Sequence, residues 1–174
     1  MLVIKAINFA FEKHRGQERR GNELPYAIHP VIVSQLIAKY KSGSSKLDEL
    51  QCAGLLHDVL EDTECDKNEL EREFGPLVAA IVVELTSDPV MLKKLGKNEY
   101  LKQKMIKMSK YAFIIKLIDR YSNILDKPGE SYVKKTLNMM EYLLENREDI
   151  TERQIRIIND IQAECLKFQA NYTA

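Results

Sequence analysis

The sequence predicts an all-α protein, and two observations lead to this fold class. Apolar side chains recur every three to four residues along most of the chain, and no segment shows the period-two alternation of a half-buried strand. The chain has 174 residues, of which 45% are hydrophobic and 30% charged, a composition typical of a folded globular protein. We therefore expect residues 1–174 to form a single domain built as a helical bundle.

In the first half of the chain, the helical periodicity predicts a helix over residues 2–14. Residues 15–28 contain two glycines and a proline and are expected to form a loop. Pro30 suits the first position of a helix, so a second helix is predicted over residues 30–40, with His29 just before it. Further helices are expected over residues 47–60, which are the most apolar, from Asp66 to Gly75, and over residues 76–85.

In the second half, residues 87–97 contain a proline, a glycine and three lysines and are predicted to form a surface loop. Helical periodicity resumes afterwards and predicts helices over residues 98–108, 110–126, 131–147 and 151–170. Thr151 and Gln154 have the spacing of a capping box, which marks the start of the last helix.

Charge, hydropathy and cysteine content narrow the possible partners. Twenty-six basic residues balance twenty-six acidic ones, so no overall positive field attracts a nucleic-acid polymer or an anionic membrane. No apolar run approaches the length of about 20 residues that a membrane span needs, and the N-terminus lacks the features of a signal peptide. Three cysteines without CxxC spacing argue against a disulfide framework or a thiolate zinc site. We therefore expect a soluble, cytoplasmic protein.

Polar residues interrupt the most apolar predicted helix. His57 and Asp58 follow an apolar run, and Glu61 and Asp62 come within the next turn. Asp58 and Asp62 are four residues apart, which places them on one face of a helix. Three carboxylates and an imidazole so close together repel one another, and a bound cation would relieve this repulsion. The alternative is a helix end that simply runs out into solvent.

Three other places raise a similar choice between an ordinary role and a functional one. His29 could point into a groove or only pack, and Asp119, which ends an apolar run, could pair with a neighbouring cation or bind a metal. The basic loop that contains Arg19 and Arg20 could be solvated or could clamp a phosphate or a base. Asn123 lies on the same helical face as Asp119.

The combination of these residues favours a metal site. His29, His57, Asp58 and Asp119 provide nitrogen and oxygen ligands without a cysteine. Such a set suits Mn²⁺, Fe or Zn²⁺ with coordination positions left open for water. A catalytic metal is therefore a better hypothesis than a structural one.

Five segments, in this order, resemble the HD-domain metal-dependent phosphohydrolases. The resemblance is to their (p)ppGpp hydrolase branch, which includes the small stand-alone alarmone hydrolases of the metazoan SpoT-homologue type. The segments are HRGQERRG at 14–21, PYAIHP at 25–30, LLHDVLEDT at 55–63, FGPLV at 74–78 and IKLIDRYSN at 115–123. They fall within residues 1–126, whereas residues 127–174 contain almost no motif and are expected to complete the bundle.

The resemblance implies a fold, a site and a reaction. The fold is the HD-type bundle, with His29, His57, Asp58 and Asp119 as ligands of a divalent metal, usually Mn²⁺. Glu61 and Asp62 match the acidic pair that handles the attacking water and the proton transfers. Arg19 and Arg20 match residues that hold the guanine nucleotide, and Asn123 matches one that contacts its sugar or phosphate. The reaction is hydrolysis of the 3′-pyrophosphate of (p)ppGpp to GDP or GTP, as in the stringent response.

The sequence departs from the family pattern in ways that keep alternatives open. The last motif reads Leu117-Ile118-Asp119-Arg120-Tyr121-Ser122-Asn123, and the Arg and Tyr that small alarmone hydrolases place on the next helix do not align with residues 131–137. One alternative is an HD phosphohydrolase for another nucleotide, such as a phosphatase for the 2′-phosphate of NADPH. Another is a nucleotide-binding module without catalysis, which the retained ligands and acidic pair disfavour.

Overall fold

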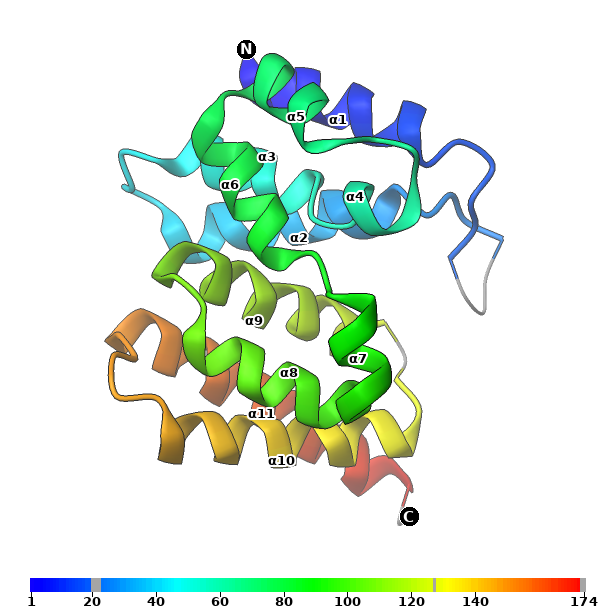
Figure 1. The fold of residues 1–174 in the computed structure, drawn as a ribbon. Helices are drawn as coiled ribbons and strands as arrows, with labels where there is room; N and C mark the ends of the chain where they lie inside the picture. Colours follow the sequence, from blue (N-terminus) through cyan, green and yellow to red (C-terminus); the bar gives the residue numbers. More distant parts are fainter. Residues whose placement is uncertain (20–22, 127, 173–174) are drawn as a thin grey trace. The chain divides into compact units, whose positions relative to one another are not determined.

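The computed structural model describes residues 1–19, 23–126 and 128–172, and these consist of helices joined by short connections (Figure 1). Within these ranges there is no β-strand, and one isolated antiparallel bridge joins Glu18 to Pro25. The all-α prediction is therefore confirmed. No helix in the described ranges is long and apolar enough to cross a membrane. The chain divides into two compact units, Met1–Ser87 and Asp88–Ala174.

The first unit is built around helix α3. Its helices are α1 (Leu2–Lys13), α2 (Ile28–Lys41), α3 (Leu47–Leu55), α4 (Val59–Asp62), α5 (Lys67–Phe74) and α6 (Pro76–Leu85). Helix α3 packs against α1, α2 and α6, and α5 packs against α6 (Figure 1). The apolar side chains at these contacts are buried: Ala6, Ala10, Val33, Ile37, Leu50, Leu55, Val78 and Val82. Helix α3 is therefore the central helix of this unit.

A glycine allows α3 to approach α2 closely. A Cβ atom built on Gly54 would lie 2.3 Å from Cδ1 of Ile37 and 3.3 Å from Cγ1 of Val33. The first of these distances is shorter than real Cβ contacts, so any larger residue at position 54 would force a neighbour to move. The close packing fixes the end of α3, from which the chain continues directly into His57.

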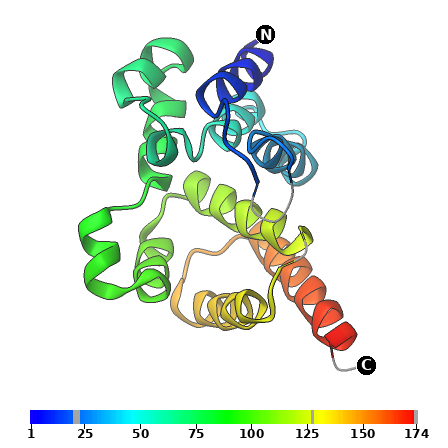
Figure 2. The ribbon, with the colours of Figure 1, turned by 90° about the vertical axis from the view of Figure 1, so that its right-hand side faces the viewer.

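The second unit contains α7 (Pro89–Leu95), α8 (Lys97–Lys107), α9 (Lys110–Leu125), α10 (Glu130–Asn146) and α11 (Glu152–Tyr172). Helix α11 packs against both α9 and α10, as Figure 2 shows, and α10 also packs against α8. The buried Arg147 binds the carbonyl oxygens of Met105 and Met108 at 2.6 and 2.7 Å, and its guanidinium lies 4.1 Å from the ring centroid of Phe113. This side chain therefore ties the end of α8 to the start of α9.

Most predicted helix ends agree with the structure to within two residues. The capping residues also behave as expected. A side-chain oxygen of Asp66 accepts a hydrogen bond from the backbone amide of Glu69. The backbone amide of Thr151 donates to Oε1 of Gln154, and the backbone amide of Gln154 donates to Oγ1 of Thr151. Helix α2, however, begins at Ile28 with Ala27 as its N-cap, so His29 lies inside the first turn and not before it.

Two predictions of local structure were wrong. The helix predicted over residues 47–60 ends at Leu55, and α4 begins at Val59 after a turn. The segment 87–97, predicted as a loop, forms α7 instead, because Oδ1 of Asp88 accepts hydrogen bonds from the amides of Val90 and Met91. Pro89 occupies the first helical position, and Gly96, with a φ of 76°, ends the helix.

Candidate active site

Two buried histidines meet in the first unit. His29 lies in the first turn of α2, and His57 lies in the turn that follows α3; each is 2% exposed. Their ring centroids are 5.2 Å apart. The close approach of α3 to α2 at Gly54 places the two rings in contact, although 27 positions separate them in the sequence.

A backbone contact determines which nitrogen of His57 can bind a ligand. Nδ1 lies 2.8 Å from the carbonyl oxygen of Gly54. A carbonyl can only accept a hydrogen bond, so Nδ1 must be the donor, and a neutral ring then has its lone pair on Nε2. Nε2 lies 2.9 Å from Oδ2 of Asp58. A lone pair and a carboxylate oxygen at this distance require a proton or a cation beside them, and histidine ligands of metals are commonly oriented by such a carbonyl. This part of the site fits a metal ion.

Asp58 is fixed from a second direction. It occupies the N-cap position of α4, and its Oδ2 also accepts a hydrogen bond from the hydroxyl of Tyr26. The Tyr26 ring lies beside the rings of His14 and His29, with centroid distances of 4.8 and 6.0 Å. The carboxylate of Asp58 is thus held between a tyrosine and a histidine.

The acidic pair lies on α4. Oε1 of Glu61 accepts a hydrogen bond of 2.5 Å from the amide of Ser87, which holds this carboxylate against the end of the unit. Partial burial raises the pKa of Asp62, and the negative charges of Asp58 and Glu61 raise that pKa further. A carboxyl group whose pKa is shifted toward neutrality is suited to proton transfer.

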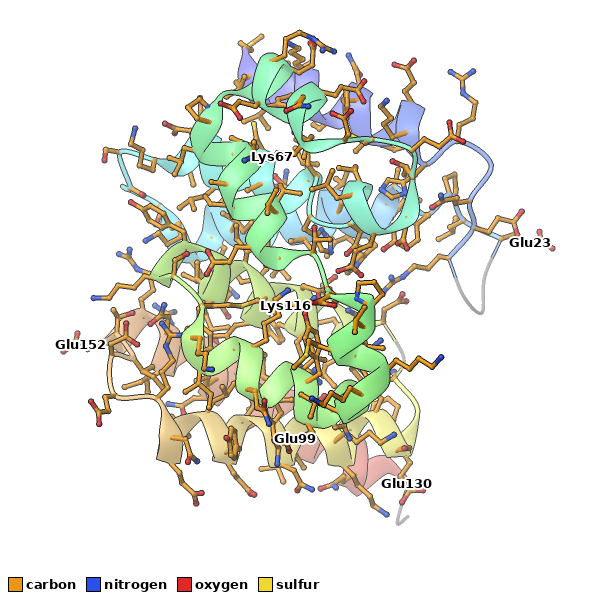
Figure 3. All side chains as sticks on the ribbon, viewed as in Figure 1. Glu23, Lys67, Glu99, Lys116, Glu130 and Glu152 are labelled. Atoms are coloured by element: carbon orange, nitrogen blue, oxygen red, sulfur yellow. The ribbon has the colours of Figure 1, made fainter. Side chains whose placement is uncertain are left out.

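Asp119 lies on α9 in the second unit, where two side chains of the same helix contact it. Nζ of Lys116, labelled in Figure 3, lies 3.1 Å from Oδ2 of Asp119. Nδ2 of Asn123 donates to Oδ1 of Asp119 at 2.9 Å and to its backbone carbonyl at 3.0 Å. Asn123 therefore supports Asp119 in the second unit, and the contact with the nucleotide that the family resemblance implies for Asn123 stays a prediction.

The predicted nucleotide-binding arginines lie in the loop between α1 and α2. The amide of Arg19 donates to the carbonyl of Leu24 at 2.9 Å, next to the bridge between Glu18 and Pro25, so this part of the loop is folded back on itself. The side chain of Arg19 is half-buried. Arg20 lies outside the described residues.

Three residues of the same loop were not assigned a role from the sequence. Tyr26 binds Asp58, Gln17 binds the backbone of Asp62, and His14 binds Gln17. For Tyr26 a signal existed, because it stands three residues before a candidate metal ligand in the Tyr-x-x-His-Pro segment. For Gln17 and His14 no pattern of charge or periodicity predicted these contacts.

Comparisons with known proteins give consistent results. A family model described as the HD domain matches residues 6–124. The Xenopus tropicalis protein named guanosine-3′,5′-bis(diphosphate) 3′-pyrophosphohydrolase MESH1 is 36% identical over 126 residues, covering 72% of this chain and 69% of the relative. The Homo sapiens protein of the same name is 35% identical over 125 residues, covering 71% and 68%. A solved structure, described as a metazoan orthologue of SpoT that hydrolyses ppGpp and plays a role in starvation responses, matches with a TM-score of 0.77 and 26% identity over 94% of both chains.

Proposed function

The chain belongs to the HD-domain family, and from this premise we propose that it hydrolyses guanosine-3′,5′-bis(diphosphate) at the 3′ position, releasing pyrophosphate and leaving GDP. The pentaphosphate form would leave GTP. The proposal is supported most directly by the contact of Nε2 of His57 with Oδ2 of Asp58 beside His29, because it brings together nitrogen and oxygen donors of the kind that a catalytic metal needs. In the cell the reaction lowers the level of ppGpp, which is a role in the stringent response.

We propose that one divalent ion binds to four residues, His29, His57, Asp58 and Asp119. We propose Mn²⁺ as this ion, with Fe or Zn²⁺ as the alternatives. All four residues lie within the part of the chain that matches the family model. Nitrogen and oxygen donors without thiolate suit these metals, and the Gly54 carbonyl leaves Nε2 of His57 available as a ligand. A bound ion of this kind lowers the pKa of water to about 7 in favourable sites and so supplies hydroxide at neutral pH.

Glu61 and Asp62 are proposed to orient the attacking water and to move protons. Hydrolysis removes a proton from water and returns one to the 3′ oxygen of the ribose as pyrophosphate leaves. Asp62, with its raised pKa, is suited to exchange that proton, and Glu61 is held in place by the amide of Ser87. Arg19, Arg20 and Asn123 are proposed to contact the nucleotide, with the arginines stacking on the base or pairing with a phosphate.

We propose that residues 1–174 work as one HD-type domain, with residues 127–174 completing it. The support is that the family match includes residues of both compact units. The substrate is a free nucleotide and not a nucleic-acid polymer, in keeping with the zero net charge of the chain. We place the protein in the cytoplasm because its three cysteines are buried and unpaired, as expected in a reducing compartment.

A panel of nucleotides tests the proposed substrate. The purified chain with Mn²⁺ is incubated with ppGpp, pppGpp, NADPH and GTP, and the release of pyrophosphate or phosphate is measured. We expect pyrophosphate and GDP or GTP from the first two. Rapid release of phosphate from NADPH without hydrolysis of ppGpp would instead select the alternative enzyme, and binding without turnover would select the non-catalytic module.

Two substitutions test the proposed roles at the site. Asp58→Ala is expected to remove bound metal and activity together. Asp62→Ala is expected to keep the metal but to lower turnover by about 10² to 10⁴, the range of a general acid or base. Metal content after dialysis and the rate at saturating ppGpp give the two readouts. Equal loss of metal in both variants would make Asp62 a metal ligand instead.

A further inference from the structure

Helix α4 contains the acidic pair and follows Asp58, yet it consists of only one turn, Val59–Asp62. A single turn is not stable on its own, because forming a first turn fixes several residues for very few hydrogen bonds. Its position must therefore be determined by contacts from outside the helix. Glu61 is held by the amide of Ser87 and Val59 is buried, and two further contacts, one at each end of α4, come from the segment that links α1 to α2.

The first contact is at the start of α4. The hydroxyl of Tyr26 donates to Oδ2 of Asp58, and this is the same oxygen that lies 2.9 Å from Nε2 of His57. The hydrogen bond fixes the orientation of the carboxylate relative to the imidazole. The Tyr26 ring is in turn positioned by its contact with the ring of His14.

The second contact is at the end of α4. Nε2 of Gln17 donates to the backbone carbonyl of Asp62 at 2.8 Å, and carbonyls at the end of a helix lack a partner within it. Because the Gln17 nitrogen is used in this way, its Oε1 is the acceptor from Nδ1 of His14, at 2.8 Å. His14 therefore orients the amide of Gln17.

We propose that Tyr26, Gln17 and His14 form a positioning clamp that holds α4 at both ends. Tyr26 sets the orientation of Asp58 as a metal ligand, and Gln17, oriented by His14, sets the position of Asp62 for proton transfer. None of the three is proposed to touch the substrate. The inference rests on the proposed function, because it assigns these residues through their effect on a metal ligand and a catalytic carboxylate.

The chemistry of the three side chains argues against a role in packing alone. His14 is 3% exposed, and its Nε2 is buried without a hydrogen-bond partner among the residues that the structure describes. An apolar side chain at this position would avoid that unfavourable burial. The polar atoms of Tyr26 and Gln17 both reach the same short helix, one at each end, which packing would not require.

Removal of one hydroxyl tests the Tyr26 contact. Tyr26→Phe keeps the ring and removes only the hydroxyl. The matched control is Tyr142→Phe, because Tyr142 lies on α10, packs its ring against Lys102 and is not part of the proposed clamp. Isothermal titration with Mn²⁺ alone is expected to show affinity about 10 to 100-fold weaker in Tyr26→Phe, as for other partners of metal ligands, and unchanged affinity in Tyr142→Phe. Unchanged affinity in Tyr26→Phe, with the helical circular dichroism of the wild type, would overturn the role of Tyr26.

A split between kcat and KM tests the other end of the clamp. At saturating Mn²⁺, Gln17→Ala is expected to lower kcat for ppGpp by about 10 to 100-fold through displacement of Asp62, with little change in KM. His14→Phe, which keeps an aromatic ring beside Tyr26, is expected to change kcat in the same direction. A raised KM with unchanged kcat would make Gln17 a substrate contact and overturn its positioning role.

The two experiments separate this inference from the proposed function. If Mn²⁺ binding weakens in Tyr26→Phe while the wild type does not hydrolyse ppGpp, the Tyr26 contact is supported and the substrate assignment is wrong. If the wild type hydrolyses ppGpp and all three variants match it in Mn²⁺ affinity and in kcat, the clamp is refuted and the proposed function remains.

Discussion

The contact at Gly54 allows a prediction in which two effects of known size oppose each other. In Gly54→Ala, the better helix propensity of alanine stabilises α3 by about 1 kcal/mol. The new Cβ, however, would lie 2.3 Å from Cδ1 of Ile37, which is fully buried, so this side chain or the backbone must shift. Overpacking of this kind costs about 1–3 kcal/mol. We therefore expect a net destabilisation of about 1 kcal/mol, or about 0.5 M in the urea midpoint.

Urea unfolding followed by circular dichroism measures this effect, and Ile37→Val identifies its cause. Because valine lacks the δ-methyl, the overpacking cost of Gly54→Ala should disappear in the double variant and only the gain in propensity should remain, giving a coupling of about 2 kcal/mol. Gly129→Ala is the control, since a Cβ there meets nothing within 4 Å; Gly129 is the N-cap of α10, so a loss of about 0.5 to 1 kcal/mol is expected, and Ile37→Val should not change it. A Gly54→Ala protein at least as stable as the wild type would refute the reasoning, because propensity would then outweigh the contact.

Three further predictions concern stability and reactivity. Arg147→Ala should destabilise the second unit by about 3 kcal/mol, since it removes charge-assisted hydrogen bonds to two carbonyls; a loss below 1 kcal/mol in urea unfolding would contradict this. Asp66→Ala should cost about 1 kcal/mol through the lost cap of α5, and Asp66→Asn should retain most of that stability. Burial raises the pKa of Cys52 and Cys65 to about 12 and that of Cys165 to about 11, so a thiol reagent at pH 8 should label them only after unfolding; rapid labelling of the native protein would show exposed thiols.

The helices were predictable where local signals determine them. Asp66, Gly75 and Thr151 mark ends that depend only on nearby residues, and the structure has these ends where the sequence indicated. Helix α7 could also have been predicted, because Asp88 followed by Pro89 is an N-cap followed by a favourable first residue. Three lysines in the segment obscured that signal, since charge is common in loops and in exposed helices alike.

The break between α3 and α4 could not be predicted from periodicity. In a continuous helix the Gly54 carbonyl would accept a hydrogen bond from the amide of Asp58, but here it accepts one from the ring of His57. Neither glycine nor proline marks this break, which depends on the packing of α3 against α2. The candidate ligands were predictable from residue type, whereas the contacts of Tyr26 and Gln17 depend on a loop whose path no local pattern determines.

The shortness of α4 has a consequence for how quickly a bound ion could leave the protein. A one-turn helix can open locally at a free-energy cost below that of global unfolding, and its amide protons then exchange with solvent faster than those of α3. Each opening would also separate Asp58 from His57, so the frequency of these openings would limit the residence time of the ion that these residues are proposed to bind. An ion that binds only the ordered turn stabilises that turn by about 2.7 kcal/mol at a free concentration one hundred times its Kd. Hydrogen exchange in this segment is therefore expected to slow when an ion occupies the proposed metal site.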